Sequence, residues 1–561
     1  MANSQTIAHL WRATVAEGRT GPAYLIEVDG EWRELSWSEA AVRVEELANG
    51  LLALGVAKGE AFGILARTSL EWALFDFALA LVGAVGAPIY ANSSPRDTRY
   101  VLEHSEAVGV LAEDDEQRAK LDGLDLAHVL TFAELDGLRA QGRAHAAAHP
   151  AALDARADSV EDDDLFTFIY TSGTTGPPKA CMIRHRNYYA MVQKGDELER
   201  MTVAGDLMLL YLPLAHNYGR LLHLSAAYIG YTIAFLPDPL QAAVELPRVR
   251  PTLFPSVPRV YEKIYAAVVA KFEEETGPRR RLIEWALKVG RRVSALRQAG
   301  RPLPVTLAWQ HRLADRLVYS KVKARLGGRL RIAQAGGAPL SREIAEFFHS
   351  IDILILEGYG LSEVTTAATV NRPDAFKFGT VGKALPGVEI RIAGDGEILL
   401  RSNTVFAGYY RDPEATAEAL DAEGFVHTGD VGQLDDDGFL TITDRKKDII
   451  VTAGGKNVAP QNLENDLKAQ RAISHALVVG DRRPYIAALL TLDPDAGADA
   501  VEVQLAVDAV NEGRSRYEQI KRFTVLPRDF TLDAGEITPT LKLRRKVILE
   551  HFAGEVEALY D

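Results

Sequence analysis

The sequence predicts an α/β protein in which sheets and helices form layers. Short apolar runs of strand length alternate with segments of helical apolar spacing, and several of these runs end in glycine-rich or polar loops. The chain has 561 residues, which allows roughly three or four folding units at about 150 residues per domain. Hydrophobic residues make up 47% of the chain and charged residues 25%, so a large core can form and global disorder is excluded.

Individual elements follow from the spacing of apolar residues. Residues 37–54 have helical spacing, with Ser36 as the expected N-cap and Glu39 completing a capping box. Residues 140–164 are rich in Ala, His and Asp and are predicted to be a surface connection, whereas residues 273–298 are predicted to form one solvated helix. The predicted strands are residues 165–170, 207–212, 231–236, 329–335 and 353–356.

The order of these elements indicates where a ligand would bind. Ligand sites in open α/β sheets lie beyond the carboxyl ends of strands, so the loops after Tyr170, Ala335 and Leu356 are the places to search. From Gly382 onward, short strand-like pieces and turns predict a smaller β-rich unit. A charged break at residues 444–448 then precedes a terminal domain of about 110 residues, which is an ordinary domain size.

Charge and cysteine content restrict the partners. The net charge is −14, which argues against a nucleic-acid partner because a phosphate backbone demands concentrated Lys and Arg, although a local basic patch would escape this argument. Cys181 is the only cysteine, which excludes an intramolecular disulfide and fits a cytoplasmic location. The first 21 residues lack the pattern of a signal peptide. The apolar stretches 77–89 and 221–236 are shorter than the ~20 residues of a membrane-spanning helix.

The first candidate site is the segment YTSGTTGPPK, residues 170–179. Glycines let a backbone approach an anion closely, Ser and Thr hydroxyls donate to phosphate oxygens, and Lys179 adds charge. The spacing is not that of a P-loop, because only two residues separate Gly173 from Gly176 and two prolines precede the lysine. On chemistry alone, a phosphate loop and a flexible surface loop are equally supported.

Later segments each have a functional and a structural interpretation. In EGYGLSEVT, Tyr359 offers a flat ring for a base and Glu363 a carboxylate for a cation near phosphates. In HTGD, Asp430 can accept from both hydroxyls of a ribose, Arg445 of DRKKD can reach ribose or phosphate, and Lys542 of ITPTLKLRR stands among further cations. Taken singly, a turn, a charged linker or a solvated basic run explains each segment better. Neither H-E-x-x-H nor G-x-S-x-G occurs, which argues against a zincin and an α/β-hydrolase.

Taken together and in this order, the segments resemble the adenylate-forming superfamily of acyl-CoA synthetases, firefly luciferases and peptide-synthetase adenylation domains. YTSGTTGPPK looks like the phosphate-loop signature of that superfamily, and EGYGLSE, HTGD, DRKKDII and the late lysine match its later signatures at fitting separations. The resemblance spans nearly the whole chain. LPLAHNYGR, SVPRVYEKIY and ITPTLKLRRKVI look most like long-chain fatty acyl-CoA synthetases.

The resemblance implies a large N-terminal domain, residues 1–446, with two layered α/β subdomains and a small β-rich unit. It also implies a mobile α+β C-terminal lid, residues 447–561, hinged near Lys447. The implied enzyme is an ATP- and Mg²⁺-dependent ligase that converts a medium- or long-chain fatty acid into acyl-adenylate and pyrophosphate, and then into acyl-CoA and AMP. Turning the lid would bring Gly454 and Gly455 toward the thiol of coenzyme A, so that one lid serves both steps.

The resemblance also implies a role for individual residues. Lys542 would bridge the substrate carboxylate and the α-phosphate, and Glu363 would be catalytic and hold Mg²⁺. His216 occupies a position that is conformationally mobile in the family, near the acyl pocket, and is the third catalytic candidate. The implied ATP-binding residues are Thr171, Ser172, Gly173, Thr174, Thr175, Gly176, Lys179, Gly337, Ala338, Pro339, Glu357, Gly358, Tyr359, Ser362, Asp430 and Arg445.

Departures from the family pattern leave the length of the acyl chain open. Ala180 stands where glycine is usual, Ser362 where threonine is commoner, and residues 217–219 where bulkier apolar side chains are usual. Two alternatives also stay open: a ligase that loads a carrier protein, and a non-catalytic nucleotide or lipid sensor. Long-chain substrates partition into bilayers, so peripheral membrane contact stays open although the sequence contains no dedicated anchor. The oligomeric state is not determined.

Overall fold

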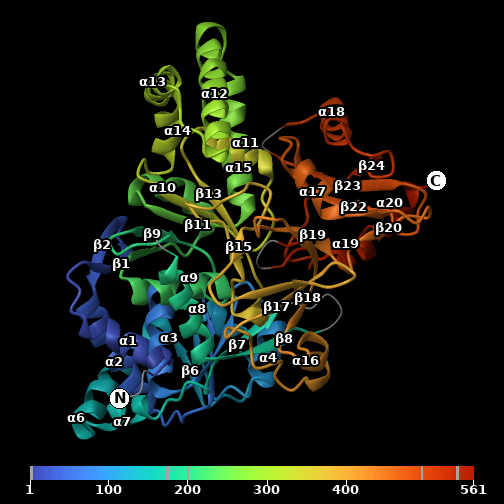
Figure 1. The fold of residues 1–561 in the computed structure, drawn as a ribbon. Helices are drawn as coiled ribbons and strands as arrows, with labels where there is room; N and C mark the ends of the chain where they lie inside the picture. The colour runs from blue at the N-terminus through green and yellow to red at the C-terminus, as the bar shows by residue number, and fades with distance from the viewer. Residues whose placement is uncertain (1–3, 172–176, 199–200, 495–496, 539–541) are drawn as a thin grey trace.

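The computed structural model describes residues 4–171, 177–198, 201–494, 497–538 and 542–561. Two large sheets with surrounding helices form the N-terminal part, followed by a β-rich unit and a C-terminal unit at the right of Figure 1, which confirms the predicted α/β fold. All five predicted strands are present, with bounds that differ from the prediction by at most three residues. They are β7 (Leu165–Thr171), β9 (Leu207–Leu210), β10 (Thr232–Phe235), β12 (Ile332–Ala335) and β13 (Ile355–Tyr359).

The first sheet has six strands in the order β6-β5-β3-β4-β7-β8. All neighbours are parallel except β8, which runs antiparallel to β7. The central strands are buried along their whole length, as expected for a parallel sheet covered on both faces. The remaining strands are β3 (Ala61–Leu65), β4 (Val85–Ile89), β5 (Gly109–Ala112), β6 (His128–Thr131) and β8 (Lys179–Arg184). The helical segments between these strands include α4 (Pro95–His104), α5 (Asp115–Ala119) and η1 (Phe132–Glu134).

The second sheet has nine strands in the order β15-β14-β13-β12-β11-β9-β10-β1-β2. Its middle strands, from β13 to β1, are parallel, and its outer strands are antiparallel to their neighbours. The remaining strands are β1 (Pro22–Val28), β2 (Glu31–Ser36), β11 (Leu253–Ser256), β14 (Thr369–Val370) and β15 (Lys383–Ala384). Short elements beside this sheet are η2 (Pro239–Gln241) and α10 (Ala242–Val249).

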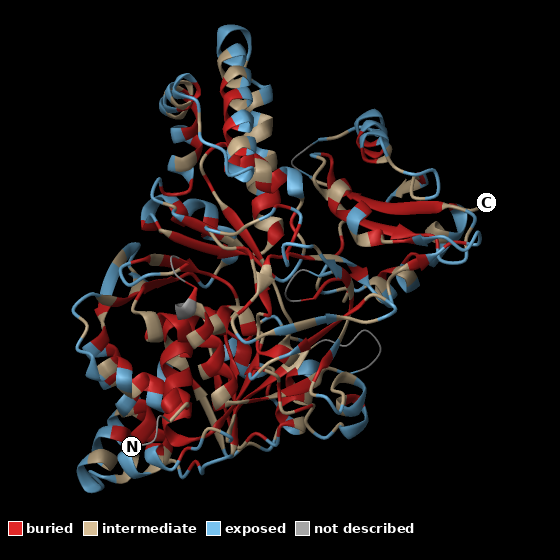
Figure 2. Cartoon of the chain, viewed as in Figure 1, coloured by how far each residue is buried: buried red, intermediate tan, exposed pale blue. Residues whose placement is uncertain are grey.

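Helices of the core join the two sheets. All but one residue of α3 (Leu70–Val82) is buried, and α9 (Asn217–Ile229) packs against α1 (Ile7–Ala16) and α8 (His185–Glu197). Figure 2 shows buried residues concentrated in this region. A buried ion pair between Arg220 and Asp76 ties α9 to α3. Because α9 begins directly after residue 216, this packing determines where His216 lies.

The predicted N-cap is confirmed, and the predicted surface connection at residues 140–164 is largely exposed, but it is helical rather than irregular. Helix α2 (Trp37–Ala53) begins with the capping box of Ser36 and Glu39. Most of residues 140–164 belongs to α6 (Leu135–Ala148) and α7 (Ala152–Asp158). A Cβ atom added at Gly142 would lie 1.9 Å from the carbonyl oxygen of Glu46 in α2. Gly142 therefore allows α6 and α2 to pack closely.

The predicted helix at residues 273–298 starts later than expected. Helix α11 (Pro258–Glu273) ends at Glu273, and α12 (Gly277–Gln298) begins at a glycine with φ of +62° followed by a proline. Such a φ favours glycine and breaks the helical path. Helices α11 and α12 rise from the body at the top of Figure 1. They are followed by α13 (Val305–Ala314), the π-helical turn η3 (Asp315–Tyr319), α14 (Ser320–Arg325) and α15 (Arg342–Ser350).

The predicted β-rich unit is a four-stranded antiparallel sheet in the order β16-β17-β18-β19. A small apolar core lies on one side of it and includes Val364 and Leu440. Its strands are β16 (Glu389–Ile392), β17 (Glu397–Arg401), β18 (Val426–Leu434) and β19 (Leu440–Arg445), and the nearby helical segments are η4 (Ser362–Val364) and α16 (Pro413–Ala419).

The C-terminal unit follows β19 and has its own apolar cores, formed by residues 450–559. Its strands are β20 (Ile450–Val451), β21 (Asn457–Val458), β22 (Ile473–Val479), β23 (Ile486–Leu492) and β24 (Ile520–Val525). Its helices are α17 (Pro460–Lys468), α18 (Ala500–Asn511), α19 (Arg545–His551) and α20 (Ala553–Ala558). Among the described helices of the whole chain, none combines the length and apolar character needed to cross a membrane.

Candidate functional site

The carboxyl end of β13 lies beside the loop that follows β12. Glu357 in β13 is buried, and its Oε2 accepts a hydrogen bond of 3.0 Å from the backbone N–H of Leu340. Burial raises the pKa of Glu357 to about 7, and the bond from Leu340 opposes this shift. Residues 337–339 lie in this loop, where Gly337 has φ of +83°. The Glu357 side chain therefore holds the loop in place, at the sheet edge where the strand order predicts a ligand.

Two of the predicted nucleotide residues are joined by a hydrogen bond between β13 and the β-rich unit. The hydroxyl of Tyr359 donates to Oδ2 of Asp430 at 2.6 Å. Asp430 in β18 is paired in register with Arg445 in β19, whose Nε lies 3.2 Å from Oδ1. Burial, followed by the negative charge of Asp430, raises the pKa of Tyr359 well above its ordinary value. An aromatic ring, a carboxylate and a guanidinium thus meet at one point.

A second group contains Glu363, Lys179 and Tyr409. The hydroxyl of Tyr409 donates to Oε1 of Glu363 at 2.6 Å, and Nζ of Lys179 lies 5.2 Å from the centre of the Tyr409 ring. Residues 407–410 reach this place by pairing with β8, where the N–H of Tyr410 donates to the carbonyl of Ala180 at 2.9 Å. Tyr409 was not predicted as a site residue, because no local pattern signals that this segment adds to a strand more than 200 residues earlier.

His216 lies at the start of α9 as its N-cap. Its Nδ1 accepts a hydrogen bond of 3.1 Å from the N–H of Tyr218. Burial, together with the positive charge of Lys542, lowers the pKa of His216 to about 3. The imidazole is therefore neutral at pH 7, and the bond to Nδ1 leaves the proton on Nε2, where it can donate.

Lys542 comes from the C-terminal unit and lies at its junction with the N-terminal part. Its N–H donates to Oγ1 of Thr538 at 3.0 Å, and the N–H of Arg544 donates to the carbonyl of Glu536 at 2.7 Å. Lys542 is exposed at the protein surface. Nearby protein atoms nevertheless displace part of the water around its ammonium group, and this desolvation lowers its pKa. The charge of Arg445 acts in the same direction, and those of Asp430 and Glu363 oppose it. The lysine is thus within electrostatic reach of both groups described above.

Residues 12–410 match the family model described as AMP-binding enzyme, and residues 447–561 match that described as AMP-binding enzyme C-terminal domain. The chain belongs to the AMP-binding enzyme family. Among curated relatives, the long-chain-fatty-acid–CoA ligase FadD15 of Mycobacterium bovis is 41% identical, over 97% of this chain and 95% of the relative. A long-chain-fatty-acid–CoA ligase of Xenopus laevis is 30% identical, over 99% of this chain and 84% of the relative.

Solved structures share the fold of this AMP-binding enzyme. The adenylation domain of a carboxylate reductase from Mycobacterium chelonae has a TM-score of 0.79 at 24% identity, with 99% of this chain and 91% of that chain covered. An anthranilate CoA ligase in complex with anthranoyl-AMP has a TM-score of 0.77 at 19% identity, with 100% and 99% covered. At these identities the likeness concerns the fold.

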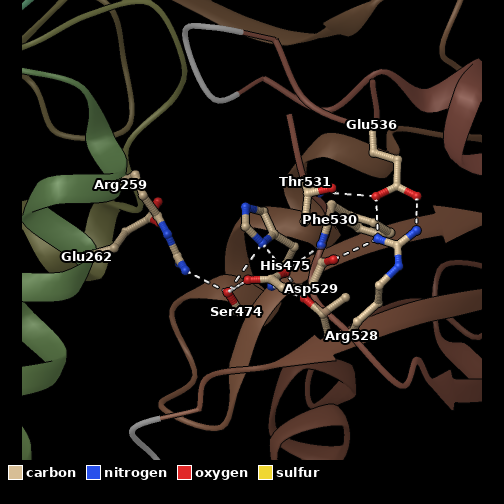
Figure 3. A network of polar contacts seen from close by, with 10 residues as sticks. Arg259, Glu262, Ser474, His475, Arg528, Asp529, Phe530, Thr531 and Glu536 are labelled. Atoms are coloured by element: carbon tan, nitrogen blue, oxygen red, sulfur yellow. Dashed lines mark hydrogen bonds and ion pairs between the residues drawn. The ribbon is translucent and has the colours of Figure 1, made fainter. Parts of the chain in front are cut away.

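A direct contact joins the two parts of the AMP-binding enzyme (Figure 3). The guanidinium of Arg259 in α11 donates to Oγ of Ser474 in β22 at 2.9 Å, and Oγ of Ser474 donates to Oδ2 of Asp529 at 2.6 Å. The neighbouring Arg528 holds Glu536 through two hydrogen bonds of 2.6 Å. Glu536 is fully buried, and its carbonyl accepts the hydrogen bond from the N–H of Arg544. Glu536 and Arg544 thus form the base of the Lys542 segment, the stretch of chain between them. Arg259 lies in the segment SVPRVYEKIY, for which the sequence predicted no site residue.

The predicted hinge lies in a turn after β19. Asp444 accepts a hydrogen bond of 3.0 Å from the N–H of Gln461, at the start of α17, and burial raises the pKa of Asp444 to about 6. Lys446 is ion-paired with Asp395 at 2.5 Å and Glu397 at 3.1 Å. Burial lowers the pKa of Lys447, the predicted hinge residue.

The remaining predicted residues are placed as follows. Gly454 and Gly455 are exposed in the turn between β20 and β21, whereas Lys542 lies at the junction. Thr171 ends β7, Gly358 lies in β13 and Ser362 begins η4. Gly337 and Ala338 are exposed, and Pro339 is partly buried. Ser172, Gly173, Thr174, Thr175 and Gly176 lie outside the described residues.

The residues present fit a magnesium ion that arrives with a nucleotide. Within the described part of the chain, no cluster of three or more His, Cys, Asp or Glu side chains could hold a metal alone. Glu363 offers a single carboxylate in the group with Lys179 and Tyr409. Mg²⁺ in phosphate-transferring sites takes one or two protein carboxylates and fills its octahedron with phosphate oxygens and water. One carboxylate therefore fits Mg²⁺ bound mainly by ATP.

Proposed function

We propose that this AMP-binding enzyme activates a medium- or long-chain fatty acid with ATP and Mg²⁺ and transfers the acyl group to coenzyme A. One observation carries the proposal: the hydroxyl of Tyr359 donates to Asp430 at 2.6 Å, and the charge of Asp430 acts on Lys542 of the C-terminal unit. The relatives named as long-chain-fatty-acid–CoA ligases support the choice of substrate, because they match over at least 97% of this chain and at least 84% of their own length.

The first half-reaction joins two anions. A carboxylate oxygen of the fatty acid attacks the α-phosphorus of ATP, the P–O bond to pyrophosphate breaks, and acyl-adenylate forms. Lys542 supplies a cation between the carboxylate and the α-phosphate, and Lys179 supplies a second one on the pyrophosphate side. When bound at Glu363, Mg²⁺ would neutralise phosphate charge. Tyr359 would face the base, while Asp430 and Arg445 would hold the ribose.

In the second half-reaction, the sulfur of coenzyme A attacks the acyl carbonyl, the bond to AMP breaks, and the thiol proton is released. We infer two domains, residues 1–446 and 447–561, with the hinge near Lys447. Rotation there would withdraw Lys542 and bring Gly454 and Gly455 toward the acyl-adenylate. In the present arrangement both glycines are exposed, as expected for a lid in its adenylation position. Neutral His216, with a proton on Nε2, would border the acyl group.

A two-stage assay tests the proposal. Purified protein is given ATP, Mg²⁺ and fatty acids of increasing chain length, and pyrophosphate release is measured before coenzyme A is added. We expect pyrophosphate release with medium or long chains, followed by AMP and thioester formation that depends on coenzyme A. Transfer to an added carrier protein in place of coenzyme A would indicate the carrier-loading alternative. Nucleotide binding without pyrophosphate release at any chain length would contradict the proposal and favour a sensor.

A further inference from the structure

One projecting part of this acidic protein is strongly basic. Residues 277–331 contain fifteen Lys and Arg residues and two Asp and Glu residues, whereas the whole chain has a net charge of −14. They include α12, α13, η3 and α14, which stand away from the C-terminal unit in Figure 1. A charge of one sign concentrated on one projection indicates a partner of the opposite sign.

The outer face of this projection is amphipathic. Helix α13, η3 and α14 form one continuous helical run, whose inner side chains are buried, including Leu307, Ala314, Val318 and Val322. Exposed side chains recur on the opposite side at helical spacing. We call this set the α13–α14 face; it consists of Val305, Trp309, Arg312, Arg316, Leu317, Lys321 and Arg325.

The cations of the α13–α14 face are not neutralised by the protein. Lys323, on the inner side, is ion-paired with Asp315 at 2.5 Å. By contrast, Arg312, Arg316, Lys321 and Arg325 are exposed and form no ion pair with any residue that the structure describes. Four cations within 14 residues of one helical run thus stay available to an external anion.

Large apolar side chains stand beside these cations. Val305 is 86% exposed and Trp309 is 65% exposed, one turn apart on α13. Leu240 and Val244 are exposed as well, on η2 and α10, and α10 packs against α14. Single exposed apolar residues are ordinary, but Trp and aliphatic side chains among Lys and Arg on one helix are typical of helices that lie in a membrane interface.

We propose that the α13–α14 face binds the surface of an anionic phospholipid bilayer. Lys and Arg would contact anionic headgroups, and Trp309 and Val305 would enter the boundary between headgroups and acyl chains. A nucleic-acid partner would not explain why the apolar Val305 is exposed. A symmetric dimer through this face would place the cations of one copy opposite those of the other, and the like charges would repel. Membrane binding is consistent with the proposed function, because fatty acids partition into bilayers. It does not depend on that function, because binding to lipid requires no catalysis.

Vesicle co-sedimentation without substrate tests the inference. The full chain is mixed with vesicles of phosphatidylcholine and phosphatidylglycerol, or of phosphatidylcholine alone. We expect partition into the anionic vesicles that falls with added salt, and little into the neutral ones. Because one Lys or Arg near an anionic surface contributes about fivefold to partition, Arg312→Glu, Arg316→Glu and Arg325→Glu together should lower it about 100-fold or more. Trp309→Ala should lower it several-fold and leave the salt dependence unchanged.

A matched variant separates this face from net charge. Arg516→Glu, Lys521→Glu and Lys546→Glu make the same charge change at exposed positions of the C-terminal unit and should leave partition within about twofold of the unaltered chain. Equal loss in both triple variants, or equal binding to neutral and anionic vesicles, would overturn the inference. So would duplex DNA binding without vesicle binding, or a dimer that only the first triple variant disrupts. Failure of the proposed function would instead show as absent pyrophosphate release with vesicle binding intact.

Discussion

The guanidinium of Arg259 in α11 donates a hydrogen bond of 2.9 Å to the hydroxyl of Ser474 in β22, and so links the N-terminal part to the unit that carries Lys542 (Figure 3). Ser474 in turn donates to Asp529, next to the Arg528 that holds Glu536 at the base of the Lys542 segment. The contact therefore stabilises the arrangement in which Lys542 lies near Glu363 and Asp430.

Arg259→Ala should favour the rotated lid. Loss of a hydrogen bond worth about 1 kcal/mol shifts the lid equilibrium about fivefold, so ATP–pyrophosphate exchange should fall by about that factor. Thioester formation from supplied acyl-adenylate should not fall. Arg342→Ala is the control, since Arg342 is exposed on the neighbouring α15 and pairs with Glu346 of the same helix. Equal loss in both half-reactions would rule out a role for this contact in lid position.

Lys542→Ala should abolish adenylation far more than thioester formation from supplied acyl-adenylate. The variant removes the cation between two anions that must approach each other, and a loss of about 100-fold or more in pyrophosphate release is expected. Lys546→Ala, four residues later and exposed, serves as the matched control and should retain activity. Similar loss in the two half-reactions of Lys542→Ala would refute the assigned role.

Lys447→Pro should spare adenylation relative to thioester formation. Proline restricts the φ angle, so the turn after β19 could no longer absorb the rotation that the second half-reaction needs. Lys447→Ala removes the same side chain without this restriction and should retain both half-reactions. If the proline variant performs both steps at the rates of the alanine variant, the hinge lies elsewhere.

Tyr409→Phe should weaken the use of Mg²⁺. The hydroxyl of Tyr409 donates to Glu363 at 2.6 Å, and a side chain that orients a metal ligand typically changes metal affinity by about tenfold or more. The Mg²⁺ concentration for half-maximal pyrophosphate release should rise by about that factor. Tyr410→Phe tests the specificity, because its hydroxyl contacts Glu106 instead. An unchanged Mg²⁺ requirement in Tyr409→Phe would disprove the link.

Glu357→Gln should stabilise the protein at alkaline pH. The pKa of Glu357 is about 7 in the folded state against an ordinary 4.5, so the unfolded chain releases this proton first as pH rises. Between pH 4.5 and about 7, the carboxyl ionises in the unfolded chain but stays protonated in the folded protein, which lowers the free energy of unfolding by up to about 3 kcal/mol. In urea unfolding, the advantage of Glu357→Gln should grow across this range. Exposed Glu274→Gln is the control, and a parallel pH profile for both variants would contradict the burial effect.

The sequence predicted the main strands well because their signal is local. A run such as residues 165–170 is mostly apolar and of strand length, and its burial on both faces needs no knowledge of its neighbours. The capping box of Ser36 and Glu39 is equally local, since three residues separate the partners. The helices within residues 140–164 were missed because their helical character depends on the close approach of Gly142 to α2, which no local spacing reveals.

By itself, the sequence determined the α/β class, the order of the signature segments and the residues Tyr359, Glu363, Asp430, Arg445 and Lys542 as candidates, because each lies in a short recognisable pattern. Only the tertiary structure decided that Tyr359 donates to Asp430, that Tyr409 stands between Lys179 and Glu363, and that Arg259 contacts Ser474. These contacts join residues that are 46 to 230 positions apart in the sequence. Strand pairing and domain packing bring such distant residues together, and no local pattern reveals them.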